Sequence, residues 1–282
     1  MVSLILATYG RADEMGRLID SLLAQTDRAF ELIVVDQNPD DRVASYVERA
    51  HQGGLEVTHV RMEKPGLSEA RNRGIALAKY PVIAFPDDDC WYEAGTIAAV
   101  CSGFEAMPGM GGLTACWVEQ RASAGPGEAY WLDYEAWRNF RGGDASSISL
   151  FLDRALFDAI GGFDPRFGVG KWYGAAEEID LVLRALAAGA RLQYNPLVRV
   201  HHAWGGAPAV PFTVLARNAR RRSRGTGAIY AKHRLSRMVV LRGVVAPVIK
   251  ALSSPSQPTR LGLALFTTLG RIEGYLRWKR GS

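Results

Sequence analysis

The chain has 282 residues, of which 48% are hydrophobic and 22% are charged, a composition typical of a globular protein with a substantial core. Its cysteines, Cys90, Cys101 and Cys116, are odd in number and show no paired ligand spacing, which argues against a disulfide framework or a cysteine metal site. We therefore expect reduced thiols in a cytoplasmic compartment. The apolar run at 2–8 carries no sign of a secretory signal.

The formal charge of +5 is unevenly distributed along the chain. From Arg217 to Ser282 there are 15 basic residues and one acidic residue, a net charge of +14, whereas residues 1–216 carry a net charge of −9. An acidic body with a strongly basic tail predicts a polyanionic partner for the tail, either an anionic membrane or a nucleic acid.

Apolar runs alternate with helical patterns over the first hundred residues. Continuous apolar runs predict strands, and apolar residues spaced three and four apart predict amphipathic helices. The expected strands are 2–8, 30–36, 55–62 and 80–88, and the expected helices are 15–25, 41–52 and 68–79. This alternation is typical of βαβ units, so we predict an α/β fold with a doubly wound, mostly parallel, Rossmann-like sheet.

The rest of the body is less regular. Residues 103–170 are rich in glycine and aromatic residues and show no clear period. The pattern at 177–189 predicts a helix closed by Gly189 in the left-handed conformation, and 192–204 has the character of an extended segment. The stretch 253–259 is a candidate linker.

Polar residues stand at the ends of the expected strands, where parallel sheets bind ligands: Thr8, Asp36 and the run from Asp87 to Asp89. Alternate side chains of an extended segment share a face, so we expect Asp87 and Asp89 to converge while Asp88 points elsewhere. Two such carboxylates, together with phosphate oxygens, suit Mg²⁺ or Mn²⁺. The alternative is a solvated acidic turn that caps the next helix.

Seven short motifs occur in order within the first 205 residues: ATYGR (7–11), VVDQNPDD (34–41), GLSEARNRGI (66–75), FPDDDCW (85–91), GGFDPRFG (161–168), EEIDLVLR (177–184) and VHH (200–202). Together they resemble the family-two glycosyltransferases of the GT-A fold, which use nucleotide-diphosphate sugars to build bacterial polysaccharides. The resemblance implies a catalytic domain at 1–212, with a nucleotide-sugar half at about 1–100 and an acceptor half at about 101–212. A basic amphipathic helical tail follows at 213–282.

The resemblance also implies roles for individual residues. Asp36 would accept a hydrogen bond from the base, and Arg71 would lie against the nucleoside or the diphosphate. Asp87 and Asp89 match the metal-binding DXD pattern, and His202 matches a histidine near the metal and the diphosphate. The full implied nucleotide-binding set is Ala7, Thr8, Tyr9, Asp36, Arg71, Asp87 and Asp88, with Mg²⁺ or Mn²⁺ as the cofactor.

Glu177 and Glu178 match the family's Glu-Asp pair, which supplies the catalytic base. A positioned carboxylate would take the proton of the acceptor hydroxyl while the nucleoside diphosphate departs, which gives direct displacement with inversion. We expect Glu178 to be this base, because the helix dipole keeps a first-turn carboxylate ionised. The alternative is that both are ordinary first-turn acids that stabilise the helix.

Two departures from the family pattern affect these expectations. The pair is Glu-Glu, so the base lies on a side chain one methylene longer than usual. The loop QNPDD (37–41) replaces the commoner DGS-type loop, which leaves the nucleotide preference open, with a UDP-linked donor as the expectation.

Several residues are candidates for the acceptor side. Trp172 and Tyr173, just before the expected helix, and Trp91, beside the acidic run, can stack on a sugar ring, and Asp164 lies in a loop that can shape the acceptor site. Packing is the alternative for the three aromatic residues, and an ordinary turn is the alternative for Asp164.

The apolar stretches of the tail are shorter than the roughly 20 residues needed to span a bilayer. Spaced arginines and lysines with Trp278 favour helices that lie in the interface of an anionic membrane. Nucleic-acid binding is less favoured, because few aromatic residues stand among the arginines. Packing on the catalytic body or a homodimer contact remains open.

The sequence as a whole predicts an inverting, metal-dependent hexosyltransferase. It would transfer a sugar from a UDP-linked donor to a lipid-linked or growing saccharide in exopolysaccharide, lipopolysaccharide or capsule synthesis. We expect a peripheral protein on the inner face of the cell membrane. The alternatives are a non-catalytic, membrane-associated nucleotide-sugar-binding protein and a sugar-nucleotide pyrophosphorylase, although the latter normally needs a Gly-rich basic loop after the first strand.

Overall fold

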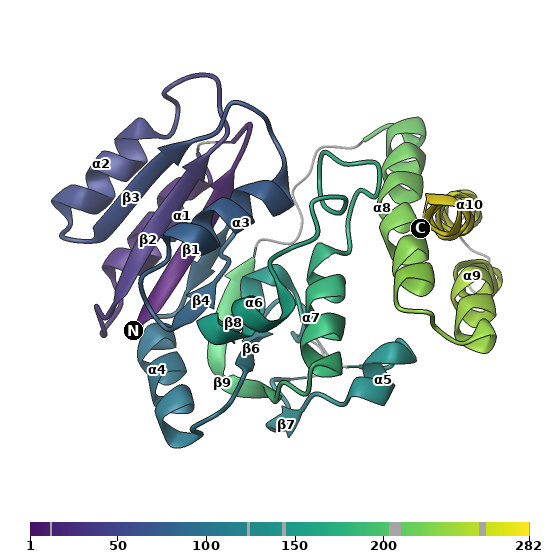
Figure 1. The fold of residues 1–282 in the computed structure, drawn as a ribbon. Coiled ribbons are helices and arrows are strands. Elements are labelled where there is room, and N and C mark those ends of the chain that lie inside the picture. Colours follow the sequence, from purple (N-terminus) through teal and green to yellow (C-terminus); the bar gives the residue numbers. More distant parts are fainter. Residues whose placement is uncertain (12, 123–124, 143–144, 203–209, 254–257, 282) are drawn as a thin grey trace.

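The computed structural model describes residues 1–11, 13–122, 125–142, 145–202, 210–253 and 258–281. In this part of the chain a nine-stranded sheet carries helices on both faces (Figure 1). The order across the sheet is β3-β2-β1-β4-β8-β6-β9-β5, and β7 pairs with β9. The strands are β1 (Val2–Thr8), β2 (Phe30–Asp36), β3 (Glu56–Arg61), β4 (Val82–Ala84), β5 (Cys90–Tyr92), β6 (Gly112–Trp117), β7 (Tyr130–Trp131), β8 (Leu150–Asp153) and β9 (Leu192–His202).

The first half of the sheet is parallel, as the sequence predicts. Strands β3, β2, β1 and β4 lie side by side in this order and run in one direction. Their register pairs Thr8 with Asp36, so the carboxyl ends of β1 and β2 lie at the same edge. Beyond β4 the sheet is mixed, because β8 runs antiparallel to β4 and β6 while β6 and β9 are parallel. The predicted α/β class is confirmed.

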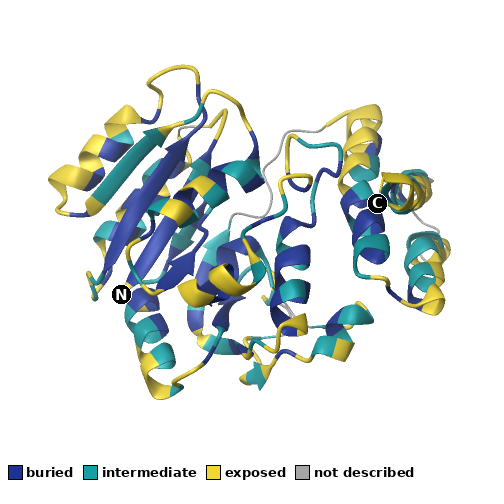
Figure 2. Ribbon diagram, in the orientation of Figure 1, coloured by how far each residue is buried: buried dark blue, intermediate teal, exposed yellow. Residues whose placement is uncertain are grey.

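Helices cover both faces of the sheet. Residues of α1, α2 and α4 bury one face, and residues of α3, α6 and α7 bury the other, which gives a hydrophobic core on each side. Figure 2 shows β1 and β2 buried between these layers. The body helices are α1 (Met15–Leu23), α2 (Ala44–Gln52), α3 (Leu67–Leu77), α4 (Thr96–Ala106), α5 (Tyr134–Arg138), α6 (Arg154–Ile160) and α7 (Glu177–Ala187), with a short 3₁₀ turn at Ser147–Ser149.

Helix α7 begins directly after a strained residue. Ala176 has a φ of 78°, in the left-handed region that costs a non-glycine residue about 1–2 kcal/mol. Such strain persists only where packing imposes it, and it clusters at functional sites. Here the neighbouring helix α8 (Phe212–Lys232) supplies the packing, because a Cβ at Gly225 would overlap the carbonyl oxygen of Ala175. At the other end Gly189 has the expected positive φ, 83°.

The basic tail is helical, as predicted, and folds into α8, α9 (Arg237–Leu252) and α10 (Pro258–Gly281). Helix α8 packs on the body, where Ala228 and Ile229 join the core beneath α7. The buried Asp180 of α7 binds Lys232 at 2.7 Å and His233 at 2.9 Å. The alternative of packing on the catalytic body therefore holds for α8.

Helix α10 lies against α8 at backbone distance. A Cβ at Gly270 would overlap the carbonyl oxygen of Arg220, and one at Gly274 would overlap that of Arg224. The absence of a side chain at both positions permits this close approach. Within the described residues, none of the helices is both long enough and apolar enough to cross a membrane. Most of the expected linker (254–257) and the end of the expected extended segment (203–204) lie outside the described residues.

Candidate active site

The acidic run lies at the carboxyl edge of the sheet, beside the end of β1. Thr8 Oγ1 donates a hydrogen bond of 2.9 Å to Asp88 Oδ2. The Arg11 guanidinium, three residues further along, forms ion pairs with Asp88, at 3.2 Å, and with Asp89. The structure therefore brings the end of the first strand and the acidic run into one site.

The side chains of the run differ from the predicted arrangement. Asp88 and Asp89 share the guanidinium of Arg11, whereas Asp87 pairs with Arg71 at 3.1 Å. The expectation that Asp88 points away from the other two is wrong, because Asp88 and Asp89 form a turn between β4 and β5. Strand alternation therefore does not apply to them.

His202, the last residue of β9, lies with its Nε2 3.0 Å from Asp89 Oδ1. Within the described residues, no three His, Cys, Asp or Glu side chains are grouped so that they could hold one metal ion. Instead Arg11 and Arg71 neutralise the carboxylates, so this edge of the sheet already attracts cations. Carboxylate oxygens and an imidazole nitrogen are suitable donors for Mn²⁺, and carboxylates for Mg²⁺. Asp87, Asp89 and His202 carry donor atoms of these kinds at this edge of the sheet, and the metal site remains a prediction.

The carboxyl groups of the run differ in pKa. Burial raises the pKa of Asp87 above its usual range and raises the pKa of Asp88 to about 6. Burial acts in the same direction on Asp89, but His202 and Arg11 outweigh it and hold the pKa of Asp89 below its usual range. The negative charge is therefore most secure at Asp89.

Asp36, at the end of β2, is fully buried and already hydrogen bonded within the protein. It accepts from the backbone N–H and the side-chain amide of Asn38, at 2.9 and 2.8 Å, and lies 3.1 Å from His59 Nε2. Asn38 Oδ1 in turn accepts from the N–H of Gly10 at 2.7 Å. The contact of Asp36 with the base remains a prediction. Sequence reasoning misses Asn38 and His59, although the unusual QNPDD loop marks the position of Asn38.

The other predicted nucleotide contacts lie at the end of β1. Thr8 is buried, Ala7 is half-buried and Tyr9 is 58% exposed. An exposed ring beside a buried polar cluster is available to a planar ligand. The nucleotide-binding role of Tyr9 also remains a prediction.

Arg71, on α3, links the acidic run to the start of α7. Its side chain is 2% exposed, with Nη1 3.2 Å from Glu177 Oε1 and Nη2 3.1 Å from Asp87 Oδ1. A guanidinium is planar and carries its donors in a fixed fork, so one side chain sets the spacing of the two carboxylates. The structure thus shows Arg71 as a buried bridge, and its contact with the nucleoside or diphosphate remains a prediction.

Glu178 is not in the expected protonation state. Burial, followed by the charge of Glu177, raises the pKa of Glu178 to about 8, although Arg71 and Arg222 act in the opposite direction. The expectation that the helix dipole keeps this carboxylate ionised at neutral pH is wrong, because lost hydration outweighs the dipole. Once deprotonated, a group with this pKa is a stronger base than an ordinary glutamate.

Trp91 packs away from the acidic run. Its ring stacks on His201 with centroids 5.1 Å apart, and the guanidinium of Arg17 lies 4.3 Å from its centre. The pairing of β5 with β9 places Trp91 opposite His201 and Cys90 opposite His202, so Trp91 and His202 belong to opposite faces of the sheet. The packing alternative is therefore favoured for Trp91.

The remaining acceptor candidates lie in the loop before α7. Asp164 binds Arg166 and Lys232, each at 2.7 Å, and these partners lower its pKa below the usual range although burial opposes them. Its charge is thus used within the protein. Trp172 and Tyr173 line a cavity next to α10. Their contact with an acceptor remains a prediction.

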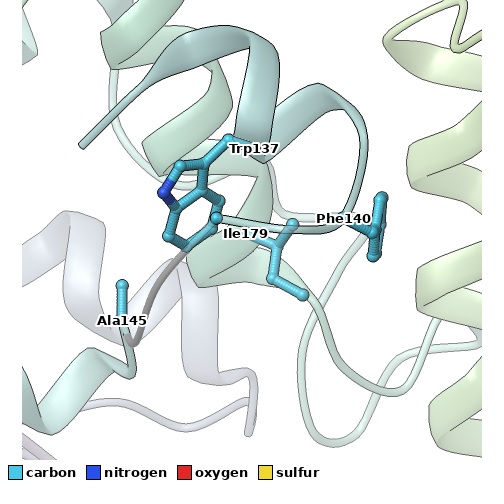
Figure 3. A pocket seen from close by; sticks show the side chains of 5 residues that line it. Trp137, Phe140, Ala145 and Ile179 are labelled. Atoms are coloured by element: carbon cyan, nitrogen blue, oxygen red, sulfur yellow. The ribbon is translucent and has the colours of Figure 1, made fainter.

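A small apolar pocket lies between α5 and α7 (Figure 3). Its volume is about 190 Å³, and its lining includes Trp137, Phe140 and Ile179, the residue after Glu178. The indole N–H of Trp137 has no hydrogen-bond partner among the described residues. Sequence reasoning misses this pocket, because Trp137 and Ile179 come together only through the packing of α5 on α7.

Two comparisons of sequence relate the chain to known proteins. Residues 3–110 match the model of Glycosyl transferase family 2. The chain is 32% identical over 224 residues to glucosyl-dolichyl phosphate glucuronosyltransferase from Haloferax volcanii, which covers 71% of this chain and 68% of that relative.

Solved structures share the fold over the whole chain. One is mannosyltransferase PcManGT from Pyrobaculum calidifontis with GDP-Man and Mn²⁺, at a TM-score of 0.66 and 18% identity, covering 100% of this chain and 87% of that one. Another is S. aureus TarS 1–349 with UDP-GlcNAc, at a TM-score of 0.61 and 14% identity, covering 100% and 92%. The predicted GT-A fold is confirmed, and the chain belongs to glycosyltransferase family 2.

Proposed function

We propose that the chain is an inverting glycosyltransferase that moves a sugar from a UDP-linked donor to a lipid-linked or growing saccharide in exopolysaccharide, lipopolysaccharide or capsule synthesis. The bridge formed by Arg71 carries this proposal, because it joins Asp87 of the acidic run to Glu177 of the catalytic pair. Donor and acceptor chemistry thereby meet at one buried cation. The nucleotide-sugar complexes of the two structural relatives support the donor class.

At the donor end, Asp87, Asp89 and His202 would hold Mg²⁺ or Mn²⁺, and the ion would offset the charge that develops on the departing diphosphate. The guanidinium of Arg11 now lies between Asp88 and Asp89. These carboxylates cannot serve both cations fully, so we infer that Arg11 turns away when the ion binds. Its side chain is 49% exposed and is free to turn toward the diphosphate.

At the acceptor end, Glu178 takes the proton of the attacking hydroxyl onto its carboxylate. Its raised pKa, about 8, makes it a strong base in the ionised form. Glu177 is committed to Arg71, so its carboxylate is less available for proton transfer. The two glutamates therefore divide the work, with one holding the bridge and the other accepting the proton.

The experiment compares Arg71→Lys with Arg73→Lys, an exposed arginine on the same helix. Purified protein is screened by thermal shift against nucleotide sugars with and without Mn²⁺, and then assayed for hydrolysis of the stabilising donor without acceptor. We expect Arg71→Lys to lose most hydrolysis, because an ammonium cannot bridge two carboxylates in a fixed plane. Full activity of Arg71→Lys, or no stabilisation by any nucleotide sugar, would contradict the proposal.

We also propose that the tail binds the anionic surface of a membrane. Helices α9 and α10 expose apolar residues at helical spacing, and the tail carries a net charge of +14. Apolar insertion together with basic residues at the headgroups is the pattern of an interfacial helix. The exposed apolar residues are Met238, Leu241, Val245, Ile249 and Leu252 on α9, and Leu261, Leu265, Leu269, Ile272 and Leu276 on α10.

Co-sedimentation with phosphatidylglycerol vesicles across a salt series tests this surface. Binding should weaken with salt but persist, because salt screens charge and not apolar insertion. The double substitution Leu241→Gln and Ile249→Gln should remove the salt-resistant part, whereas Leu197→Gln, an exposed apolar position on β9, should not. Deletion of the whole tail is unsuitable, because it would expose the core under α8. Equal sedimentation of all variants would remove the membrane from the proposal.

A further inference from the structure

A cavity of about 390 Å³ lies between the loop before α7 and the end of α10. Its walls come from segments far apart in the sequence, so neither the body nor the tail forms it alone. The lining residues are Arg166, Lys171, Trp172, Tyr173, Arg277, Trp278 and Gly281.

Among the lining residues only basic side chains carry a charge, and they differ in how far they are already paired. Arg166 binds Asp164, and Lys171 binds Glu69. Arg277 has no carboxylate partner in the described part of the chain, and its guanidinium lies 4.2 Å from the ring centre of Trp172. The cavity thus retains an uncompensated cation beside an aromatic ring, which suits an anion joined to an apolar or sugar group.

The aromatic wall is held in place from several sides. Trp278 stacks on Phe167 with centroids 5.4 Å apart, lies 5.5 Å from Tyr173 and carries the Arg166 guanidinium at 4.0 Å. A ring fixed by such contacts loses little freedom when it meets a ligand. The wall is therefore ordered before any ligand arrives.

The cavity stands close to the catalytic pair and to the apolar face of the tail. A Cβ at Gly168, in the same loop, would lie 3.6 Å from the carboxyl carbon of Glu177. On the other side, Leu276 precedes Arg277 and belongs to the row of exposed apolar residues on α10. One molecule can therefore reach from the catalytic pair, across the cationic cavity, to an apolar surface.

We infer that this cavity binds the phosphate or diphosphate of a lipid-linked acceptor, an inference that rests on the proposed transferase function. Arg277 and Lys171 contact the phosphate oxygens, and Trp172 lies against the sugar that follows. The lipid extends along the exposed row of α10. The same chemistry would admit free inorganic phosphate, so the test separates the two sources.

The test measures binding of farnesyl phosphate in detergent by calorimetry, with farnesol and inorganic phosphate as comparison ligands. We expect farnesyl phosphate to bind more tightly than farnesol and inorganic phosphate. Arg277→Gln should weaken the affinity for farnesyl phosphate about tenfold, as expected for the loss of one charge-assisted contact. Arg73→Gln, an exposed arginine on α3 outside the lining, should leave it unchanged. We expect the same order of affinities for the three ligands at a second salt concentration.

Farnesol binding as tightly as farnesyl phosphate, or an unchanged affinity in Arg277→Gln, would overturn the phosphate assignment. Inorganic phosphate that binds as tightly as farnesyl phosphate would overturn the lipid-linked part. Titration of UDP with Mn²⁺ on the same samples keeps the two proposals apart. If the native protein does not bind UDP, the donor assignment is refuted. If it binds UDP but not farnesyl phosphate, only the assignment of this cavity to a lipid phosphate is refuted.

Discussion

Replacing Glu178 by glutamine should make the free energy of unfolding less dependent on pH. In the folded protein, burial and Glu177 raise the pKa of Glu178 from 4.5 to about 8. The folded state therefore holds this proton where the unfolded chain has lost it, so the contribution of Glu178 to stability falls as pH rises from 4.5 to about 8. Glutamine does not titrate and cannot show this loss.

The expected magnitude follows from the same shift. For a single group titrating between these pKa values, the free energy of unfolding falls by at most about 4 kcal/mol from pH 5 to pH 9. Glu178 is half-buried, so water screens part of this effect, and we expect about 2 kcal/mol. Between pH 5 and pH 9, the free energy of unfolding of the glutamine variant should therefore rise by about this much relative to that of the native protein.

Urea denaturation at pH 5, 7 and 9 measures the effect, with Asp158→Asn, an exposed carboxylate on α6, as the matched control. The control should follow the native protein at each pH. If the difference between Glu178→Gln and the native protein stays constant from pH 5 to pH 9, Glu178 is not a proton-retaining group and the reasoning fails.

The remaining predictions concern the reaction. Glu178→Gln should lower turnover by at least about 10²-fold and keep the affinity for UDP, and the turnover of the native protein should rise with pH through about 8. Steady-state kinetics measures both. If Glu178→Gln keeps normal turnover and Glu177→Gln loses it, Glu177 is the base. Asp89→Ala should abolish Mn²⁺-dependent UDP binding in calorimetry, and unchanged affinity would remove this aspartate from the metal site. Arg11→Gln should tighten Mn²⁺ binding about tenfold in a titration without nucleotide, because a competing cation is gone; weaker binding would show that Arg11 supports the ion.

The parallel half of the sheet and the polar ends of its strands could be predicted because they depend on local patterns. Thr8 and Asp36 end their strands at the same edge, as the alternation of strands and helices indicates. The orientation of the acidic run could not be predicted, because it depends on Arg11 and Arg71, which approach from other elements. Strand alternation alone assigned Asp88 to the wrong side.

Contacts between distant segments account for the other differences. Trp91 stacks on His201 through the pairing of β5 with β9, and no local pattern indicates that pairing. The pKa of Glu178 depends on how deeply α7 is covered, which the helical period does not report. Trp278 meets Tyr173 only because α10 folds back over the body. Sequence patterns give the elements here, whereas charge states and cavities require their packing.

The close glycine contacts of the tail couple the position of α10 to that of α8 and α7. Gly270 and Gly274 let α10 rest on the backbone of α8, and Gly225 lets α8 rest on the backbone of Ala175, next to the strained Ala176. Main-chain geometry, and not adaptable side chains, therefore sets each contact. A displacement of α10 would therefore also displace α8 and, through α8, the first turn of α7. A substitution as small as Gly274→Ala would push α10 away from α8 and thereby shift the helix that begins at Glu177.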